Sequence, residues 1–248
     1  MPDSQEKRLA PPQNTLEFPR RHEDQPRKSC GPVAAFFDLD RTIVRANTGS
    51  FYILDLYADG QLSLLSLIKL GWVFLRYRLT GVENIDAFTK AGAALSGVRS
   101  SDIKTRYARL LESKIRPLIS DAAVEAIRGH WRLGHVVVML TAQSSFIAEP
   151  IGHLLGIDHV LCTRFEEVDG VLTGRLEGPA CYGQGKVHWA HEFAAQHGID
   201  VRRSYFYTDS HSDLPMLYEV KEKRAVNPDP KLRREATRRG WPVLRFED

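Results

Sequence analysis

The sequence predicts an α/β protein with a largely parallel sheet and a block of helices inserted after the first strand. Short apolar runs rich in β-branched and aromatic residues lie at 33–37, 135–140 and 204–207, and such runs are typical of buried strands. Segments with helical spacing alternate with these runs, as in layered proteins with parallel strands. A long helical stretch without a strand signal separates the first two runs, which indicates an insertion.

The first strand is predicted at Val33–Phe37, directly after a Gly-Pro pair. Apolar residues then recur at helical spacing up to about residue 117. They include Phe51, Leu54, Leu56, Tyr57, Leu64, Leu65, Ile68, Trp72, Leu75, Ile103, Tyr107, Leu110 and Leu111. We therefore expect a core domain made of residues 31–47 and 118–248, with a helical cap at residues 48–117.

Strands and helices alternate through the second half of the chain. Ser120 is a candidate N-cap for a helix that begins at Asp121, and Gly134 ends this helix. A strand at 135–140 that ends at Thr141, a helix at about 145–155 and a short strand near 160–163 are expected next. A hairpin at 165–174 should turn at Asp169 and Gly170. After it we expect a helix from about Gly185, strands at 204–207 and 224–226, a helix from about Asp229 and a strand at 243–246. This order predicts a parallel sheet covered by helices.

The composition is that of a soluble globular protein: 43% of the 248 residues are hydrophobic and 26% are charged. The formal net charge of +3 is only mildly basic, so we expect no nucleic-acid partner. Cys30, Cys162 and Cys181 are odd in number and widely spaced, which argues against a disulfide framework or a zinc site. A reduced, cytoplasmic setting is therefore expected.

Two segments bear on targeting and membranes. Residues 1–30 carry mixed charges and prolines without an apolar core, so we expect a flexible tail rather than a secretory signal. Leu62–Leu79 is strongly apolar, but Lys69 lies near its middle, and a central charge makes membrane insertion costly. We favour amphipathic cap helices over stable membrane insertion, and their apolar face is compatible with a homodimer.

Polar side chains follow the predicted strands or begin the predicted helices. They are Asp38 and Asp40 after the first strand, Thr141 after the second, Lys186 in a Gly-rich turn before a helix, and Asp209 and Asp213 after the strand at 204–207. Ligands gather at the carboxyl ends of parallel strands, so we expect these residues to form one site.

The residue types in this group indicate phosphoryl chemistry. Oxygen-only acidic clusters suit Mg²⁺, and a lysine and a hydroxyl beside a metal suit a phosphoryl group. A carboxylate can also attack phosphorus and form an aspartyl phosphate. Each feature alone has an ordinary structural explanation: a surface Asp-x-Asp, a strand-end hydroxyl, a solvated lysine, or helix N-caps around Ser212. Their combined order along the chain favours the functional interpretation.

In this order the features resemble the motifs of the haloacid dehalogenase-like hydrolase superfamily. The matching residues are Asp38-Leu-Asp40-Arg-Thr, Leu140-Thr141, Lys186 and Asp209-Ser-His-Ser-Asp213. The helical block looks like the small cap of the phosphoserine phosphatase-like branch, subfamily IB. Further similarities to one group of that branch lie at Phe146–Ile151, Thr173–Arg175, Asp213–Leu217 and Val226–Asp229. The resemblance covers the chain from about Val33 onward and implies a three-layer, Rossmann-like core with a parallel sheet and a helical cap.

The resemblance also implies a role for each residue. Asp38 would be the nucleophile, and Asp40 would be the proton donor and then the general base. Thr141 and the Ala142 backbone would bind phosphate, and Lys186 would balance its charge. Asp38, Asp209 and the Asp40 carbonyl would ligate Mg²⁺, and Asp213 would support the metal site or Lys186. Residues two apart on a strand point the same way, so Asp38 and Asp40 can face one phosphate.

Two departures from the branch bear on the substrate. Asn47 stands where phosphoserine phosphatases carry a Glu that holds the substrate ammonium, and Ala142-Gln143 replaces a Gly-Gly pair. These differences argue against phosphoserine and favour another small phosphorylated metabolite, for which histidinol phosphate is one candidate. The function expected is Mg²⁺-dependent hydrolysis of a phosphomonoester. A phosphotransferase that uses an alcohol acceptor, a non-catalytic interaction protein on the same fold and a membrane-surface protein remain as alternatives.

Overall fold

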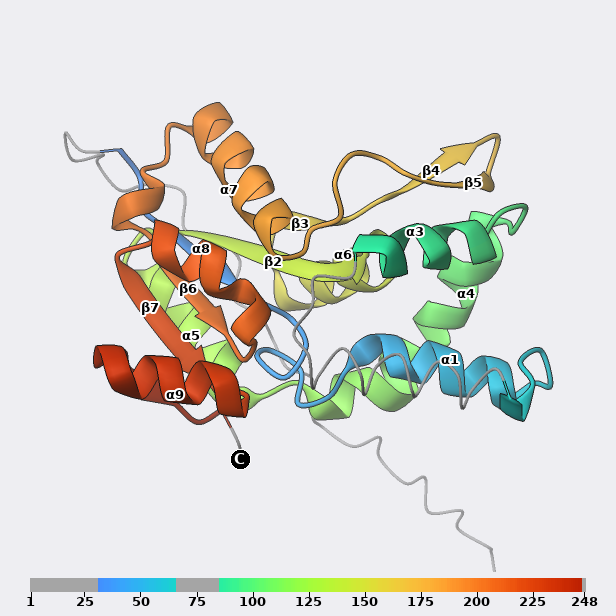
Figure 1. The fold of residues 1–248 in the computed structure, drawn as a ribbon, viewed down its shortest axis with the longest axis horizontal. Coiled ribbons are helices and arrows are strands. Elements are labelled where there is room, and N and C mark those ends of the chain that lie inside the picture. The colour runs from blue at the N-terminus through green and yellow to red at the C-terminus, as the bar shows by residue number, and fades with distance from the viewer. Residues whose placement is uncertain (1–30, 66–84, 247–248) are drawn as a thin grey trace, which may run out of the picture.

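The structure, a computed structural model, describes residues 31–65 and 85–246, which form a six-stranded parallel sheet with helices on both faces (Figure 1). The sheet order is β3-β2-β1-β6-β7-β8, and every neighbouring pair is parallel. The strands are β1 (Ala34–Phe37), β2 (Val136–Ser144), β3 (His159–Thr163), β6 (Tyr205–Thr208), β7 (Glu222–Val226) and β8 (Val243–Leu244). The predicted α/β class is confirmed.

Strand β1 lies at the centre of the sheet, between β2 and β6, and all four of its residues are buried. A short run that is apolar at every position is typical of a parallel strand covered on both faces. Ala35 and Phe37 face one hydrophobic cluster, whereas Ala34 and Phe36 face the other. The apolar run therefore sets β1 in the middle of the molecule and places the residue after it, Asp38, at the centre of one sheet edge.

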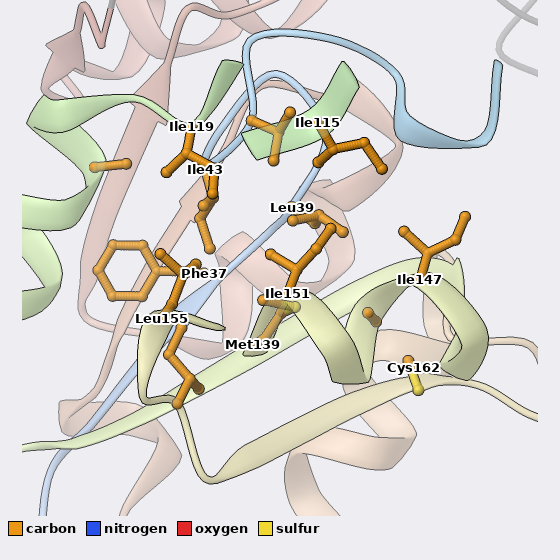
Figure 2. Packing of buried hydrophobic residues seen from close by; sticks show 14 of the residues in the cluster. Phe37, Leu39, Ile43, Ile115, Ile119, Met139, Ile147, Ile151, Leu155 and Cys162 are labelled. Atoms are coloured by element: carbon orange, nitrogen blue, oxygen red, sulfur yellow. The ribbon is translucent and has the colours of Figure 1, made fainter. Parts of the chain in front are cut away.

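Two groups of helices cover the two faces of the sheet. Helices α5 (Asp121–Arg132) and α6 (Ser145–Leu155) pack on one face, and α7 (Gln184–His197), α8 (Leu214–Glu219) and α9 (Pro230–Arg239) pack on the other. Figure 2 shows the first of these layers, in which Ile151 and Leu155 of α6 lie near Phe37 and Met139 of the sheet. These two helical layers and the sheet make three layers.

The inserted segment is largely helical where it is described. It contains α1 (Thr48–Ala58), α3 (Ile85–Ala94), α4 (Ser100–Leu110), a π-helical turn at Leu111–Ile115 and a 3₁₀ turn at Arg116–Leu118. Arg106 of α4 holds α1 through ion pairs with Asp55 and Asp59, at 2.5 and 2.7 Å. Tyr52 and Tyr107 stack between the same two helices, with ring centroids 4.8 Å apart.

The hairpin predicted after residue 164 is present as β4 (Phe165–Val168) and β5 (Val171–Leu176), and it turns at Asp169 and Gly170 as expected. It extends away from the sheet toward α3 and α4 (Figure 1). The backbone of Leu172 exchanges hydrogen bonds with Gly97 and Val98, each 2.9 Å long. A segment that follows the core strands in sequence therefore packs on the inserted helices.

The end predicted for the second strand is wrong by three residues. We expected it to end at Thr141, but β2 continues to Ser144. Its pairing with β1 ends at Met139, while its pairing with β3 continues to Ser144 and Thr163 through an irregular register. Neighbouring β3 supplies the extra hydrogen bonds, and polar residues beyond Leu140 hide this continuation in the sequence.

The helix starts predicted at Ser120 and Asp229 are confirmed. The Ser120 hydroxyl accepts a hydrogen bond from the Ala123 amide and caps α5, and Asp229 caps α9 in the same way. Cys162 and Cys181 are buried free thiols. The predicted tail at 1–30 and residues 66–79 of the apolar stretch lie outside the described residues. Among residues 31–65 and 85–246, no helix is both long enough and apolar enough to cross a membrane.

Candidate active site

The predicted site residues meet at one edge of the sheet. Asp38 directly follows β1, Asp209 directly follows β6, and Thr141 lies in β2 just beyond its pairing with β1. These three strands are neighbours and run in the same direction, so their carboxyl ends lie side by side. Asp38, Thr141 and Asp209 are all buried, at 6, 1 and 7% exposure.

Lys186 reaches this group of acids from helix α7. Its Nζ atom donates hydrogen bonds to Asp38 Oδ1 and to Asp213 Oδ2, each at 2.7 Å, and the side chain is buried. The Thr208 hydroxyl donates to the same Asp213 oxygen at 2.6 Å. Asp213 therefore accepts hydrogen bonds from both Lys186 and Thr208.

A tight turn before α7 brings Lys186 into place. Lys186 lies in the first turn of α7, which begins at Gln184. A Cβ atom on Gly185 would lie 1.8 Å from the carbonyl oxygen of Ala180, a distance that no side chain permits. The Gly-rich sequence noted before this helix thus has a steric reason, because only glycine allows the preceding chain to approach so closely.

The charges in this cluster do not balance. Asp38, Asp209 and Asp213 bring three carboxyl groups next to one ammonium group. Burial raises the pKa of Asp38 to about 7, although Lys186 opposes this shift. Burial also raises the pKa of Asp209, and the charges of Asp38 and Asp213 raise it further. Burial alone would lower the pKa of Lys186, but the carboxylates of Asp213 and Asp38 raise it above its usual value.

This imbalance fits a divalent cation. Within residues 31–65 and 85–246, no donor is hydrogen-bonded to the Asp209 carboxylate, and no three His, Cys, Asp or Glu side chains form a ready-made metal site. The set implied by the resemblance needs only two carboxylates, Asp38 and Asp209, with the Asp40 carbonyl. Mg²⁺ takes oxygen ligands, keeps several waters and uses one or two carboxylates, so the residues present suit it.

Asp40 is held apart from this ion-pair cluster. Its Oδ1 atom accepts hydrogen bonds from the amide and hydroxyl of Thr48, at 2.9 and 2.7 Å, and its Oδ2 atom accepts one from Gln143 Nε2 at 2.5 Å. Burial raises the pKa of Asp40, and the bonds from Thr48 and Gln143 partly offset this shift. Asp40 is thus connected both to the first turn of α1 and to the end of β2.

The loop between β1 and α1 folds tightly around this carboxylate. The Leu39 carbonyl accepts hydrogen bonds from the amides of Thr42, Ile43 and Val44. Arg41 adopts a positive φ of 57°, and its carbonyl accepts a hydrogen bond from Asn227 Nδ2 at 3.3 Å. The predicted first motif therefore forms a compact turn, with its second acid directed toward the inserted helices.

Thr141 and Ala142, for which the resemblance implies phosphate binding, lie in β2 beyond its pairing with β1. The Thr141 hydroxyl accepts a hydrogen bond from the Gln143 amide at 3.2 Å, which leaves its own hydrogen for a second partner. The Ala142 carbonyl accepts a hydrogen bond from the Thr163 hydroxyl at 3.0 Å, which fixes this peptide against β3.

Sequence reasoning missed three residues that hold the acids. Thr48, Gln143 and Thr208 each donate a hydrogen bond to a site carboxylate, but none of them belongs to a charged pattern. Gln143 offered one signal, because it stands where the branch has glycine. From the sequence alone this difference indicated a change of substrate, and it gave no sign of the hydrogen bond from Gln143 to Asp40.

Comparison with known proteins identifies the family of this chain. The profile of the haloacid dehalogenase-like hydrolase family matches residues 35–218. The chain is 37% identical to the inhibition of morphological differentiation protein of Streptomyces azureus, over 86% of this chain and 78% of that protein. It is 31% identical to a phosphoserine phosphatase of Mycobacterium tuberculosis, over 86 and 71% of the two chains. It is also 31% identical to a histidinol-phosphatase of Neisseria meningitidis, over 86 and 98%.

Solved structures show the same fold. A protein of unknown function from Bordetella pertussis Tohama I superimposes with a TM-score of 0.79 and 28% identity, over 88% of this chain and all of that chain. A phosphoserine phosphatase with an analogue of its phospho-aspartyl intermediate gives a TM-score of 0.65 at 18% identity, over 88 and 94%. With four ordered motifs, one buried acid–lysine cluster and these relatives, the chain belongs to the haloacid dehalogenase-like hydrolase family, in its phosphoserine phosphatase-like branch.

Proposed function

We propose that this protein hydrolyses a small phosphomonoester with Mg²⁺ and an aspartyl-phosphate intermediate. The observation that carries the proposal is the contact of Lys186 with both Asp38 and Asp213 at 2.7 Å, buried at the carboxyl edge of the sheet. A lysine held there can balance charge on a nucleophilic carboxylate and on the phosphoryl group that it receives. Asp40 lies two residues away and is free of that ion pair.

The reaction divides into two displacements at phosphorus. An Asp38 oxygen attacks phosphorus, the bond from phosphorus to the ester oxygen breaks, and Asp40 donates its proton to the departing alkoxide. Asp40 then takes a proton from water, the water oxygen attacks phosphorus, and the bond to Asp38 breaks. Inorganic phosphate leaves with Asp38 regenerated. Mg²⁺ would neutralise phosphoryl charge, and Asp38, Asp209 and the Asp40 carbonyl would hold it.

Thr141, Ala142 and Lys186 bind the phosphoryl oxygens in this proposal. The Thr141 hydroxyl donates one hydrogen bond, the backbone around Ala142 contributes another, and the Lys186 ammonium supplies the charge. All three come from neighbouring elements of one sheet edge, so their positions are fixed before a substrate arrives.

The substrate is a phosphomonoester other than phosphoserine in this proposal. Asn47, which stands where a carboxylate would hold the phosphoserine ammonium, uses its side-chain oxygen to cap α1 and accepts a hydrogen bond from Ser50 at 3.1 Å. Histidinol phosphate and phosphoserine both belong in the test, because relatives of this chain carry those names. A phosphotransferase reaction would differ only in the acceptor that replaces water.

Turnover of a panel of phosphate esters with Mg²⁺ tests the function. We expect release of inorganic phosphate from at least one small ester, and a loss on the order of 10⁴-fold or more in Asp38→Asn, which keeps the shape of the side chain but removes the nucleophile. Circular dichroism should show that the variant is folded. Full activity of folded Asp38→Asn would refute the aspartyl-phosphate route. Transfer of phosphate to an added alcohol in place of release would identify a phosphotransferase.

We also propose a cytoplasmic protein without nucleic-acid or stable membrane contacts. The buried free thiols of Cys162 and Cys181 suit a reducing compartment. A homodimer is compatible with the apolar residues exposed at the far end of α1 and after it, which are Leu54, Tyr57, Leu64 and Leu65. Sedimentation velocity at several concentrations would determine the oligomeric state, and fractionation of cells would determine the compartment.

A further inference from the structure

The carboxylate of Asp40 accepts hydrogen bonds from two directions, from the first inserted helix and from the sheet. Thr48, the first residue of α1, donates two hydrogen bonds to Oδ1. Gln143, near the end of β2, donates one to Oδ2 at 2.5 Å, across 103 residues of sequence. These three donors fix both oxygens, and therefore the plane of the carboxyl group.

These hydrogen bonds leave few lone-pair directions of the Asp40 carboxylate unoccupied. Each carboxylate oxygen has about two lone-pair directions. Thr48 occupies both directions of Oδ1, whereas Gln143 occupies one direction of Oδ2. Among the described residues no further donor contacts Asp40, so a single direction on Oδ2 remains for a proton. The geometry thus selects one oxygen and one direction for proton transfer.

The Gln143 amide is itself confined. A Cβ atom built on Gly49, in the first turn of α1, would lie 3.1 Å from Gln143 Oε1 and 3.2 Å from Nε2. Such distances are tighter than most contacts, so a methyl group at position 49 would push the amide group by a few tenths of an ångström. The side-chain amide of Gln143 therefore lies directly against the first turn of α1.

We propose that Gln143 is a positioning residue that aims the proton of Asp40 at the reacting oxygen. This inference rests on the proposed function, since it assigns a duty to a residue that acts through the general acid and base. Gln143 holds Oδ2 so that its free lone-pair direction gives a proton to the leaving oxygen and later takes one from water. It exchanges no proton itself and touches Asp40 rather than phosphorus.

The test separates aiming of a proton from general damage to the site. An alkyl ester such as β-glycerol phosphate needs a proton on its leaving oxygen, whereas p-nitrophenyl phosphate releases a stable phenolate that needs little help. The ratio kcat/KM reports the steps up to formation of the phosphoenzyme. We expect Gln143→Met, which has a similar shape and no donor, to lose about 10- to 100-fold in kcat/KM on β-glycerol phosphate and less than about threefold on p-nitrophenyl phosphate.

A second variant perturbs the hydrogen bond between Gln143 and Asp40 from helix α1. Gly49→Ala leaves Gln143 in place but crowds its amide group, so we expect a smaller loss confined to the alkyl ester. Ser144→Ala is the matched control, because Ser144 is the next residue of β2 and its side chain makes no capping hydrogen bond to α6. Both ester reactions should be unchanged in Ser144→Ala, and urea unfolding should show that all three variants are folded.

The outcomes distinguish this inference from the proposed function. Equal losses on the two esters, or no loss on β-glycerol phosphate, in a folded Gln143→Met variant would overturn the positioning role and leave phosphatase activity intact. Failure of the wild-type protein to hydrolyse either ester or any member of the wider panel would overturn the proposed function itself. Selective loss on the alkyl ester in Gln143→Met and Gly49→Ala supports the inference.

Discussion

Lys186 carries its charge in a place from which water is almost excluded. Removing an ammonium group from water is expensive, and only close, well-directed partners offset that cost. Asp38 and Asp213 supply them at 2.7 Å, and Phe206 places its ring 5.5 Å from Nζ. The lysine and the two acids are therefore one unit, and the loss of any member leaves the others unbalanced.

Lys186→Met should damage both stability and activity. The substitution removes the charge that balances Asp38 and Asp213, so we expect the free energy of unfolding to fall by about 3–5 kcal/mol at neutral pH. Activity should fall by at least about 100-fold, because the phosphoryl charge loses a cation. Urea unfolding and ester turnover measure the two effects.

Lys104→Met is the control for that change. Lys104 is an exposed residue 3.8 Å from Glu167, and a surface pair of this kind contributes less than about 1 kcal/mol. Equal effects of Lys104→Met and Lys186→Met would contradict the importance of burial at Lys186.

At the scale of single residues, the sequence predicted the acids and the lysine but not the groups that hold them. Asp38 and Asp209 stand out because charged residues directly after apolar runs are unusual, and Lys186 stands out because it follows a Gly-rich turn in a recognisable order of motifs. Gln143 and Thr48 are uncharged residues with many ordinary uses, and only the folded chain brings them to Asp40.

Helix α7 depends on the close approach of two backbone segments. The Ala180 carbonyl occupies the space that a side chain on Gly185 would need, and the next residue is Lys186. The turn thus sets both the start of the helix and the position of its charge.

Gly185→Ala should lower stability and activity together. The added methyl group cannot fit 1.8 Å from the Ala180 carbonyl, so the turn must shift and move Lys186 with it. We expect a loss of about 2 kcal/mol or more in the free energy of unfolding and at least tenfold in turnover. Gly129→Ala is the matched control inside α5, where the nearest atom is 3.9 Å away. That change should stabilise the protein by up to about 1 kcal/mol, and a similar loss there would refute the steric account.

Helix α5 is attached to the sheet by a buried histidine. His130 Nε2 lies 2.9 Å from the Tyr207 hydroxyl of β6, and its Nδ1 lies 2.8 Å from Nδ1 of His135. Two facing ring nitrogens form a hydrogen bond only when one of them lacks a proton. Burial first, and then the charges of His135 and Arg224, lower the pKa of His130 to about 4.

Stability should fall as the pH decreases from about 6.5 toward 4. In this range the unfolded chain protonates His130 while the folded protein keeps it neutral, so protons favour unfolding. The full contribution at pH 7 is on the order of 3 kcal/mol, from a pKa of about 4 against the usual 6.5. Urea unfolding at several pH values should show a weaker pH dependence for His130→Gln. His153→Gln, on the exposed side of α6, should leave the wild-type slope unchanged, whereas an unchanged slope in His130→Gln would remove His130 as its cause.

At the scale of elements, apolar periodicity predicted most helices and strands. It failed where contacts with a neighbouring element set the length or the packing of a segment. Strand β2 outlasts its apolar run because β3 continues beside it to Thr163. The hairpin was predicted from its turn, but its packing on Gly97 and Val98 has no local signal. The division into a core at 31–47 and 118–248 and a cap at 48–117 stays a prediction.

The whole molecule gathers distant segments at one sheet edge and places three carboxyl groups there beside one lysine. Residues near positions 38, 141, 186 and 209 meet there because parallel strands share one carboxyl edge. Three carboxyl groups share one lysine there, and burial together with their mutual repulsion raises the pKa of Asp38 and of Asp209. Folding therefore places acidic groups together at a cost that a cation can offset.

Mg²⁺ should stabilise the wild-type protein but not Asp209→Asn. A ligand that binds only the folded state at one hundred times its Kd adds about 2.7 kcal/mol to the free energy of unfolding. Without Mg²⁺, Asp209→Asn should be at least as stable as wild type, since it removes a buried charge that repels Asp38 and Asp213. Thermal unfolding with Mg²⁺ and with EDTA checks both statements. Asp169→Asn, in the turn of the hairpin, should keep the wild-type response; a full response in Asp209→Asn would exclude Asp209 as a ligand.

The sequence by itself determined the α/β class, the order of the elements and the candidates for the reacting groups. These properties depend on local patterns, namely apolar runs, caps, turns and charged residues at strand ends, which neighbouring residues along the chain create. The tertiary structure alone decided which donors hold Asp40, how far β2 extends and where the hairpin packs. These properties depend on contacts between segments up to 103 residues apart, and such contacts exist only after the chain has folded.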